Sequence, residues 1–224
     1  MKIRSIKAYD RFWFAVKIFL YACVWLLPGF VTATDYTYEI HPKPRKEYEI
    51  KDDKIFYRVG DSGLILQLVD SDEIAEFYKD RGAQIGNPLE SLGDEAEGAT
   101  IFLLTLINRT HGALTFTPGY VLMKVGDNSS FAMDFTVLLP LLDNLDGKAR
   151  KIVQDSVFHS PEVIRPGSVV SKFLIYPGLP KKFDEFKISF DYVFFGGNKE
   201  SKCDFYYQHV KIKATETQKH EERK

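Results

Sequence analysis

The chain has 224 residues, of which 45% are hydrophobic, and its 30 basic and 31 acidic residues leave a formal net charge of −1. That length suffices for one domain with a substantial core, and the balanced charge argues against a nucleic-acid-binding protein, which would present a basic face. Its two cysteines exclude a fold that depends on a framework of disulfides.

The N-terminal residues have the pattern of an export signal. Five of the first 17 residues are basic and one is acidic, and residues 18–31 are apolar. A basic stretch, an apolar core and small residues before a cleavage site are the three regions of a secretory signal peptide. We therefore expect residues 1–33 to be a signal peptide, with Val31 and Ala33 at the positions that the peptidase reads.

A second interpretation keeps this segment in the membrane. If Lys17 is tolerated near the cytoplasmic end, the apolar run over 12–30 has roughly the minimum length of a spanning helix. Residues 1–33 would then be a signal-anchor, joined to the rest by the proline-rich linker at 41–44. Both interpretations place the rest of the chain outside the cytoplasm, in the periplasm or at the cell surface. Lipid attachment at Cys23 is a third interpretation of the same segment.

Cleavage would change the charge and the cysteine count of what remains. Removing five basic residues and one acid leaves 25 basic and 30 acidic residues in a mature chain of 191, with a net charge of −5. Cys203 would have no internal partner, so it could be a nucleophile, an intermolecular crosslink or a small buried hydrophobic residue. The mature fold would then depend on its core alone.

Residues 34–50 predict an N-terminal strand followed by a linker. Tyrosine and isoleucine alternate with polar residues over 36–40, at the period of a half-buried strand. The prolines of the segment 41–44 fix their own backbone and restrict the residues before them, so this segment is expected to be extended.

A β-hairpin and a short helix follow. Residues 55–59 and 64–69 have strand patterns and flank Gly60-Asp61-Ser62-Gly63, which is typical of a turn. Residues 70–82 then predict a helix that begins with a capping box and ends at a glycine. The loop after this helix contains acids that are either exposed to solvent or calcium ligands without the spacing of an EF-hand: Glu90, Asp94, Glu95 and Glu97.

The centre of the chain is the most apolar part after the export segment. Residues 101–107 form an almost continuous apolar run, which indicates a strand buried on both faces. Pro118-Gly119 lies between the strand-like segments 114–116 and 120–125 and predicts a second hairpin.

Residues 131–157 predict a helical insertion into the strand pattern. Five apolar residues recur there at helical spacing despite Pro140, and we call them the leucine stripe: Val137, Leu138, Leu141, Leu142 and Leu145. The leucine stripe either packs into the core or is exposed as a contact surface for a partner or for lipid.

The C-terminal third is the clearest β region. Residues 169–176 lie between proline-glycine turns, and residues 186–194 have the best period-two alternation in the chain. Glycines at 196–197 turn the chain, and residues 203–212 predict the returning strand. The segment 214–224 is charged and lacks large apolar residues, so we expect a disordered tail.

Short strands separated by Gly/Pro turns predict a mainly β fold, with antiparallel sheets packed as a sandwich in a single domain over 34–213. Four segments carry a resemblance: Leu104–Thr110, Ile164–Gly167, Phe173–Tyr176 and Phe186–Phe190. Together they resemble the immunoglobulin-like β-sandwich modules of uncharacterised bacterial envelope proteins. The resemblance spans about Thr100–Ile212, implies that fold and an extracytoplasmic location, and transfers no functional residue.

No residue pattern identifies a reaction. The sequence has no glycine-rich phosphate loop, no zinc-binding His-x-x-x-His, no paired-cysteine metal site and no Gly-x-Ser-x-Gly elbow. Its five histidines are far apart in sequence, although His111 and His159 lie in turn-like segments that could approach each other. We therefore name no catalytic, cofactor-binding or metal-binding residue and expect no cofactor.

Two hypotheses from different classes remain. The first is an exported, non-enzymatic envelope protein whose sandwich is a binding or structural module for another protein or envelope component. Its 18 phenylalanines and 12 tyrosines suit a contact surface, for which the leucine stripe is the candidate. The second is an extracytoplasmic hydrolase or metal-handling protein with a site in the sandwich loops.

Overall fold

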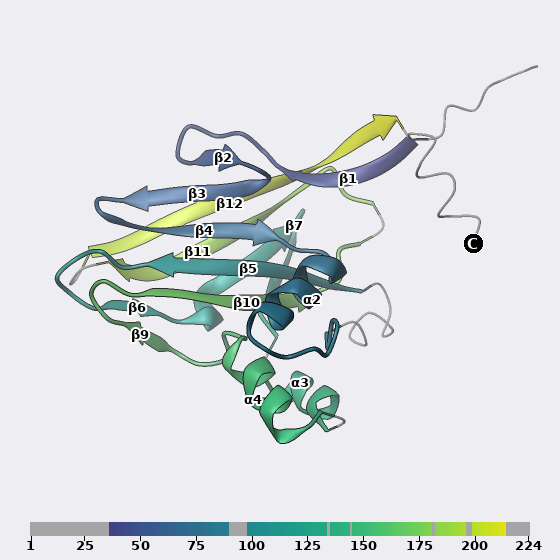
Figure 1. Ribbon diagram of the computed structural model, residues 1–224. Coiled ribbons are helices and arrows are strands. Elements are labelled where there is room, and N and C mark those ends of the chain that lie inside the picture. Colours follow the sequence, from purple (N-terminus) through teal and green to yellow (C-terminus); the bar gives the residue numbers. More distant parts are fainter. Residues whose placement is uncertain are drawn as a thin grey trace, which may run out of the picture. The chain divides into compact units, whose positions relative to one another are not determined.

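The computed structural model describes residues 36–89, 98–133, 135–143, 145–180, 182–195 and 199–213 (Figure 1). The chain divides into a large unit, Tyr38–Ile212, and a small unit made of Met1–Thr37 and Lys213–Lys224. The predicted export segment, the charged tail and the acids between 90 and 97 lie outside the described residues, so what the sequence predicts for them stays a prediction. Among the described residues, no helix combines the length and the apolar character that a membrane span requires.

The described strands form two sheets. The order in the first is β1-β12-β11-β6-β9, with β7 paired to β11 and to β8. Its strands are β1 (Tyr36–Pro42), β6 (Leu114–Phe116), β7 (Val121–Val125), β8 (Asn128–Phe131), β9 (Glu162–Ile164), β11 (Glu185–Phe195) and β12 (Lys199–Lys213). The second has the order β10-β5-β4-β3-β2 and consists of β2 (Glu49–Lys51), β3 (Lys54–Val59), β4 (Ser62–Leu68), β5 (Ala99–Ile107) and β10 (Val169–Pro177). The pairs formed among β2 to β12 are antiparallel, which confirms a mainly β fold with antiparallel sheets.

The two sheets pack against each other through the main hydrophobic core. Side chains alternate between the two faces of a strand, and alternate residues enter this core from β5 (Phe102, Leu104, Leu106) and from the middle of β12 (Cys203, Phe205, Tyr207). The ring centroid of Phe102 on β5 lies 6.2 Å from the ring centroid of Phe186 and 5.3 Å from that of Tyr207, and both of these residues are on the other sheet. These three aromatic side chains are at most 2% exposed, and burial of the two phenylalanines stabilises the sandwich-like layering by about 1.5–3 kcal/mol each.

Strands β5 and β10 bury side chains on both of their faces. Phe102 and Leu174 belong to the core between the sheets, whereas Ile101 and Phe173 belong to a second cluster on the outer face of the five-stranded sheet. The run 101–107 is therefore buried on both faces over its first half, as its continuous apolar sequence predicts.

Helix α2 (Ser71–Asp80) covers part of this second cluster. It begins as the sequence predicts, because the Asp70 carboxylate accepts the Glu73 N–H at 2.9 Å and the Glu73 carboxylate accepts the Asp70 N–H at 3.1 Å. On the buried side of the helix, the ring centroid of Phe77 lies 4.4 Å from the ring centroid of Phe173 on β10. The capping box and the aromatic contact together fix where the helix starts and which face it buries.

Helices α3 (Phe135–Leu142) and α4 (Gly147–Asp155) lie within the predicted insertion. The segments that flank them run along the free edge of β10. The Met133 N–H donates to Ile175 O at 2.6 Å, the Phe173 N–H donates to Ser156 O at 2.7 Å, and the Phe158 N–H donates to Phe173 O at 3.0 Å. The insertion therefore satisfies backbone groups that an edge strand would otherwise expose.

The hairpin predicted around Pro118-Gly119 is wrong. Strand β6 pairs with β9 and β11, while β7 pairs with β11 and β8, so that β6 and β7 do not pair with each other. Pro118–Tyr120 forms one turn of 3-10 helix, after which the chain continues along the same edge of β11. The hairpin predicted around residues 60–63 and the return of β12 along β11 are confirmed.

Candidate functional site

Two of the five side chains of the leucine stripe are placed by the structure. Leu142 is 3% exposed within the second cluster, and Leu145 packs against the same cluster. These two residues are therefore part of the core. The side chains of Val137, Leu138 and Leu141 lie outside the described ones, and a contact role for them stays a prediction.

The outer face of the five-stranded sheet is a stronger candidate surface. The registers of its strands place outward-facing residues in cross-strand rows. Two neighbouring rows form what we call the outer-face patch: Arg58, Gly63, Ile107 and Val169 in one row, and Phe56, Ile65, Thr105 and Ser171 in the next. Apart from Gly63, each of these residues is half-buried or exposed.

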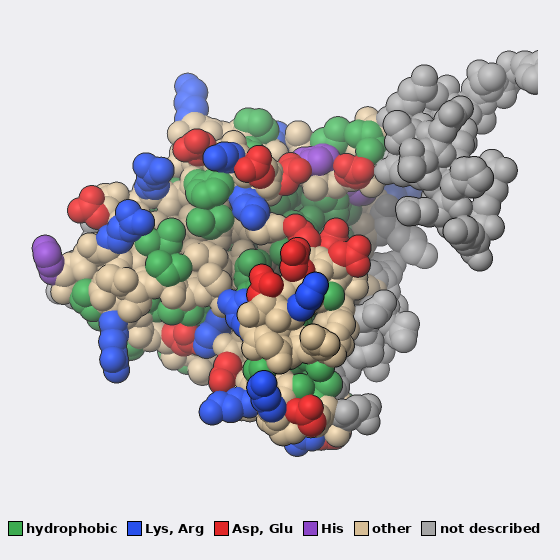
Figure 2. Space-filling view, viewed as in Figure 1, with side chains coloured by type: hydrophobic (Ala, Val, Ile, Leu, Met, Phe, Trp, Pro, Cys, Tyr) green, Lys and Arg blue, Asp and Glu red, His purple; other side chains and the backbone are tan. Residues whose placement is uncertain are grey.

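The helices and the outer-face patch divide this face of the sheet between them. Phe173 and Ile175 on β10 are buried under the second cluster, whereas Val169, toward the start of the same strand, is 59% exposed. Figure 2 looks onto this face and shows hydrophobic side chains exposed beside the helices, with Lys and Arg side chains around them. One half of the face is thus covered within the chain and the other half is open.

An open hollow of about 510 Å³ lies at one end of the outer-face patch. Its apolar part comes from Phe56, Ile65 and Ile107, and its rim includes Arg58 and Arg109. The volume falls within the range of about 300–1,000 Å³ that is usual for ligand sites. The hollow is shallow and bounded by a sheet face, so an occupant would be covered on one side only.

Glycine is required in the row that crosses this hollow. A Cβ atom added to Gly63 would lie 2.3 Å from the carbonyl oxygen of Tyr57 and 3.3 Å from the Cα of Arg58. No side chain therefore separates Arg58 from Ile107, which pair with Gly63 from the two sides.

A buried polar network holds the backbone of Arg109 beside the hollow. Asn108 is fully buried, and its amide nitrogen donates to Gly112 O at 2.8 Å and to Ile164 O at 2.9 Å. The Arg109 N–H donates to the hydroxyl of Ser62 at 3.0 Å. Because these bonds join the ends of β4, β5 and β9, the position of Arg109 is fixed by three strands.

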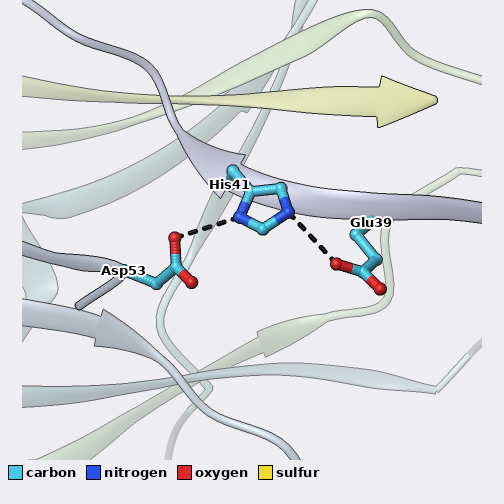
Figure 3. A network of polar contacts seen from close by, with 3 residues as sticks. All are labelled: Glu39, His41 and Asp53. Atoms are coloured by element: carbon cyan, nitrogen blue, oxygen red, sulfur yellow. Dashed lines mark hydrogen bonds and ion pairs between the residues drawn. The ribbon is translucent and has the colours of Figure 1, made fainter. Parts of the chain in front are cut away.

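A second polar site surrounds His41 on β1 (Figure 3). The imidazole Nδ1 lies 3.0 Å from an oxygen of Asp53, and Nε2 lies 3.2 Å from an oxygen of Glu39. Asp52 and Asp53 form the turn between β2 and β3 with φ angles of 50° and 55°, a left-handed conformation that a two-residue hairpin turn of this kind requires. The turn thereby brings Asp53 up to a strand of the other sheet.

The geometry at His41 suits a charged imidazole. The hydrogen bond with Asp53 raises the pKa of His41 above its ordinary value, Glu39 adds to this effect, and partial burial opposes it. Both ring nitrogens are engaged by carboxylates, so neither is free to accept a proton from a substrate or to bind a metal. Among the described residues, no group of three or more His, Cys, Asp or Glu side chains could hold a metal ion.

The surface beside His41 is acidic. A groove of about 580 Å³ is lined by Glu39, Asp52, Asp53, Asp70 and Glu73, together with His41. No Lys or Arg contributes to its lining in the described part of the chain. His111 and His159, which the sequence left open as metal ligands, are exposed to solvent.

Cys203 is buried in the main core. It is 7% exposed, and burial raises its pKa to about 12, with the nearby Asp204 and Asp191 adding to the rise. At neutral pH it is therefore a thiol and not the thiolate that a nucleophile requires. Of the roles that the sequence left open, this environment fits the small buried hydrophobic residue.

The residues of the outer-face patch were not singled out by the sequence. Phe56 and Ile65 stand among the outward positions of β3 and β4, where alternation alone predicts polar residues. That break in the alternation is the signal that could have found them. The presence of Arg58 and Arg109 at one hollow, in contrast, depends on the pairing of three strands.

Comparison with known proteins adds no assignment to this geometry. No protein-family model, no curated protein and no solved structure matches the chain. The function must therefore be inferred from the residues themselves. Within the described part of the chain, the candidate surfaces considered are the outer-face patch with its arginines and the acidic groove beside His41.

Proposed function

We propose that this protein is exported from the cytoplasm and is a non-enzymatic binding module of the cell envelope. Its antiparallel sheets form an immunoglobulin-like β-sandwich, which presents the outer-face patch to another protein. The export segment over 1–33 supports the location, and the open sheet face supports the role.

The observation that carries this proposal is the contrast between the two halves of one sheet face. Helices bury Phe173 and Ile175 on β10, while Val169 on that strand, Ile65 on β4 and Phe56 on β3 stay partly open to solvent. Contiguous apolar side chains on an open surface, bordered by charged residues, are typical of a protein contact site. We therefore retain the binding-module hypothesis from the sequence but place its contact surface on the outer-face patch, since two residues of the leucine stripe are in the core.

The polar site does not favour the enzymatic alternative. A general base or metal ligand needs a free ring nitrogen, and both nitrogens of His41 are engaged by carboxylates. A thiol nucleophile needs a low pKa, and that of Cys203 is raised. The environments of His41 and Cys203 therefore favour structural roles over catalytic ones.

The test compares partner capture by three forms of the full chain. Tagged wild type, Ile65→Gln and Phe131→Gln would be used to capture proteins from envelope extracts of the source cell. Ile65 lies in the outer-face patch, and Phe131 is a 63% exposed apolar residue of the other sheet. We expect a protein that the wild type and Phe131→Gln capture equally and Ile65→Gln captures poorly. Equal capture by all three forms would contradict the proposal.

Export has a separate test. Intact mass of the protein recovered from its host should correspond to a chain that begins after Ala33, and the protein should be found in the extracytoplasmic fraction. A mass that includes Met1 with recovery in the membrane fraction would support the signal-anchor. Recovery of the complete chain from the cytoplasm would contradict export.

A further inference from the structure

We propose that the hollow in the outer-face patch binds a carboxylate next to an apolar side chain in a peptide segment of the protein partner. This inference rests on the proposed binding function and adds the chemistry of what is bound. It is carried by two guanidinium groups, an apolar floor and an opening on one side.

The first step concerns charge. Arg58 and Arg109 both line the hollow and are exposed. Within the described part of the chain, neither side chain makes an ion pair. Asp61 is the acid that also lines the hollow, so two cations face one anion. A guanidinium presents its donors as a planar fork that fits a carboxylate with two parallel hydrogen bonds.

The second step concerns the floor. Phe56, Ile65 and Ile107 are half-buried and line the hollow, with Ile107 in the row of Arg58 and the other two in the adjacent row. Gly63 leaves the row between Arg58 and Ile107 without a side chain. An occupant can therefore place an anionic group at the guanidiniums and an apolar group on this floor. An acidic residue beside an aromatic or aliphatic one has that arrangement.

The third step concerns the source of the carboxylate. The sheet face covers an occupant on one side only, so a free fatty acid would leave much of its chain in water. A peptide segment is covered on its other side by the partner to which it belongs. The fixed backbone of Arg109, held through Ser62, also reduces the ordering that binding requires. The cover on one side only favours a protein over a lipid.

The experiment uses two dipeptide probes that differ only in charge. Acetyl-Asp-Phe-amide and acetyl-Asn-Phe-amide would be titrated into the isotope-labelled full chain, as purified from its host, and followed by NMR. We expect the acidic probe to shift the backbone amides of Gly63, Ile65, Ile107 and Arg109. Its affinity should exceed that of the neutral probe about three- to tenfold, the scale of an exposed charge-assisted hydrogen bond.

Variants separate this inference from the proposed function. Arg58→Gln and Arg109→Gln should each weaken the acidic probe about threefold or more and leave the neutral probe unchanged, while Lys151→Gln on the exposed side of α4 should change neither. If Ile65→Gln abolishes partner capture but the arginine variants bind both probes as the wild type does, the contact face stands and the carboxylate inference fails. Shifts at other amides, equal binding of both probes, or tighter binding of decanoate at the same residues would also overturn it.

Discussion

Replacing Gly63 by alanine should destabilise the β3–β4 hairpin and with it the whole domain. The added Cβ would lie 2.3 Å from the Tyr57 carbonyl oxygen, whereas real Cβ atoms stay at least 3.0 Å from such neighbours. The contact is with backbone, so the distance between this Cβ and the Tyr57 oxygen must increase by at least 0.7 Å through a shift of the paired strands. Overpacking of this kind costs about 1–3 kcal/mol, and each kcal/mol lowers the Tm of a domain of this size by about 2–4 °C.

The assay is thermal and urea unfolding followed by circular dichroism, with Gly119→Ala as the matched control. A Cβ at Gly119 meets nothing within 4 Å, so its effect on the free energy of unfolding should stay within about 0.5 kcal/mol. We expect Gly63→Ala to melt about 2–12 °C below the wild type. If it melts together with Gly119→Ala, the close approach of the two strands, and the empty position in the row beside Arg58, are refuted.

Three further predictions concern the core, the imidazole and the thiol. Phe173→Ala should lower the free energy of unfolding by about 3–5 kcal/mol, because Phe173 is fully buried between the sheet and α2. Phe131→Ala, at a 63% exposed position, should change it by less than about 0.5 kcal/mol. Equal losses of stability in urea unfolding would show that the helices do not cover β10. The pKa of His41 is raised in the folded state, so its contribution to stability is complete below the unfolded pKa of about 6.5 and disappears as the pH rises through the folded value. His41→Gln should therefore be less stable than wild type by under about 1 kcal/mol in mildly acidic buffer and equally stable in alkaline buffer, and a gap that persists unchanged in alkaline buffer would contradict the ion pair. Cys203 should resist alkylation by iodoacetamide in the native protein at mildly alkaline pH and react after denaturation, because burial raises its pKa to about 12. Peptide mapping by mass spectrometry would detect the modified residue. Rapid labelling of the native protein would contradict the burial of Cys203.

Local signals predicted those parts of the fold that local interactions determine. The turn at 60–63 joins two strands that are adjacent in sequence, and the capping box at Asp70 involves residues three apart. The continuous apolar run over 101–107 also indicated burial on both faces before any partner strand was known. The turn and the capping box are local in sequence, whereas the burial of this run, complete over its first half, depends on packing against the other sheet and the helices.

The sequence misses or leaves undecided those features that contacts between distant segments determine. Pro118-Gly119 has the composition of a hairpin turn, yet the long strand β11 accepts both β6 and β7 along one edge. The leucine stripe has helical spacing, and only the placement of the second cluster shows that Leu142 and Leu145 face inward. The hollow depends on the registers that join β3, β4 and β5, so no single segment of the sequence contains it.

The backbone bonds between the insertion and β10 also limit how this protein could be shortened. Met133, Ser156 and Phe158 occupy the hydrogen-bonding groups along the edge at Phe173 and Ile175. A chain trimmed of α3, α4 and their flanks would expose both a row of unpaired peptide groups and the apolar side chains beneath the helices. Such an edge is a template for pairing with other chains. We therefore expect removal of the insertion to produce aggregation instead of a smaller domain.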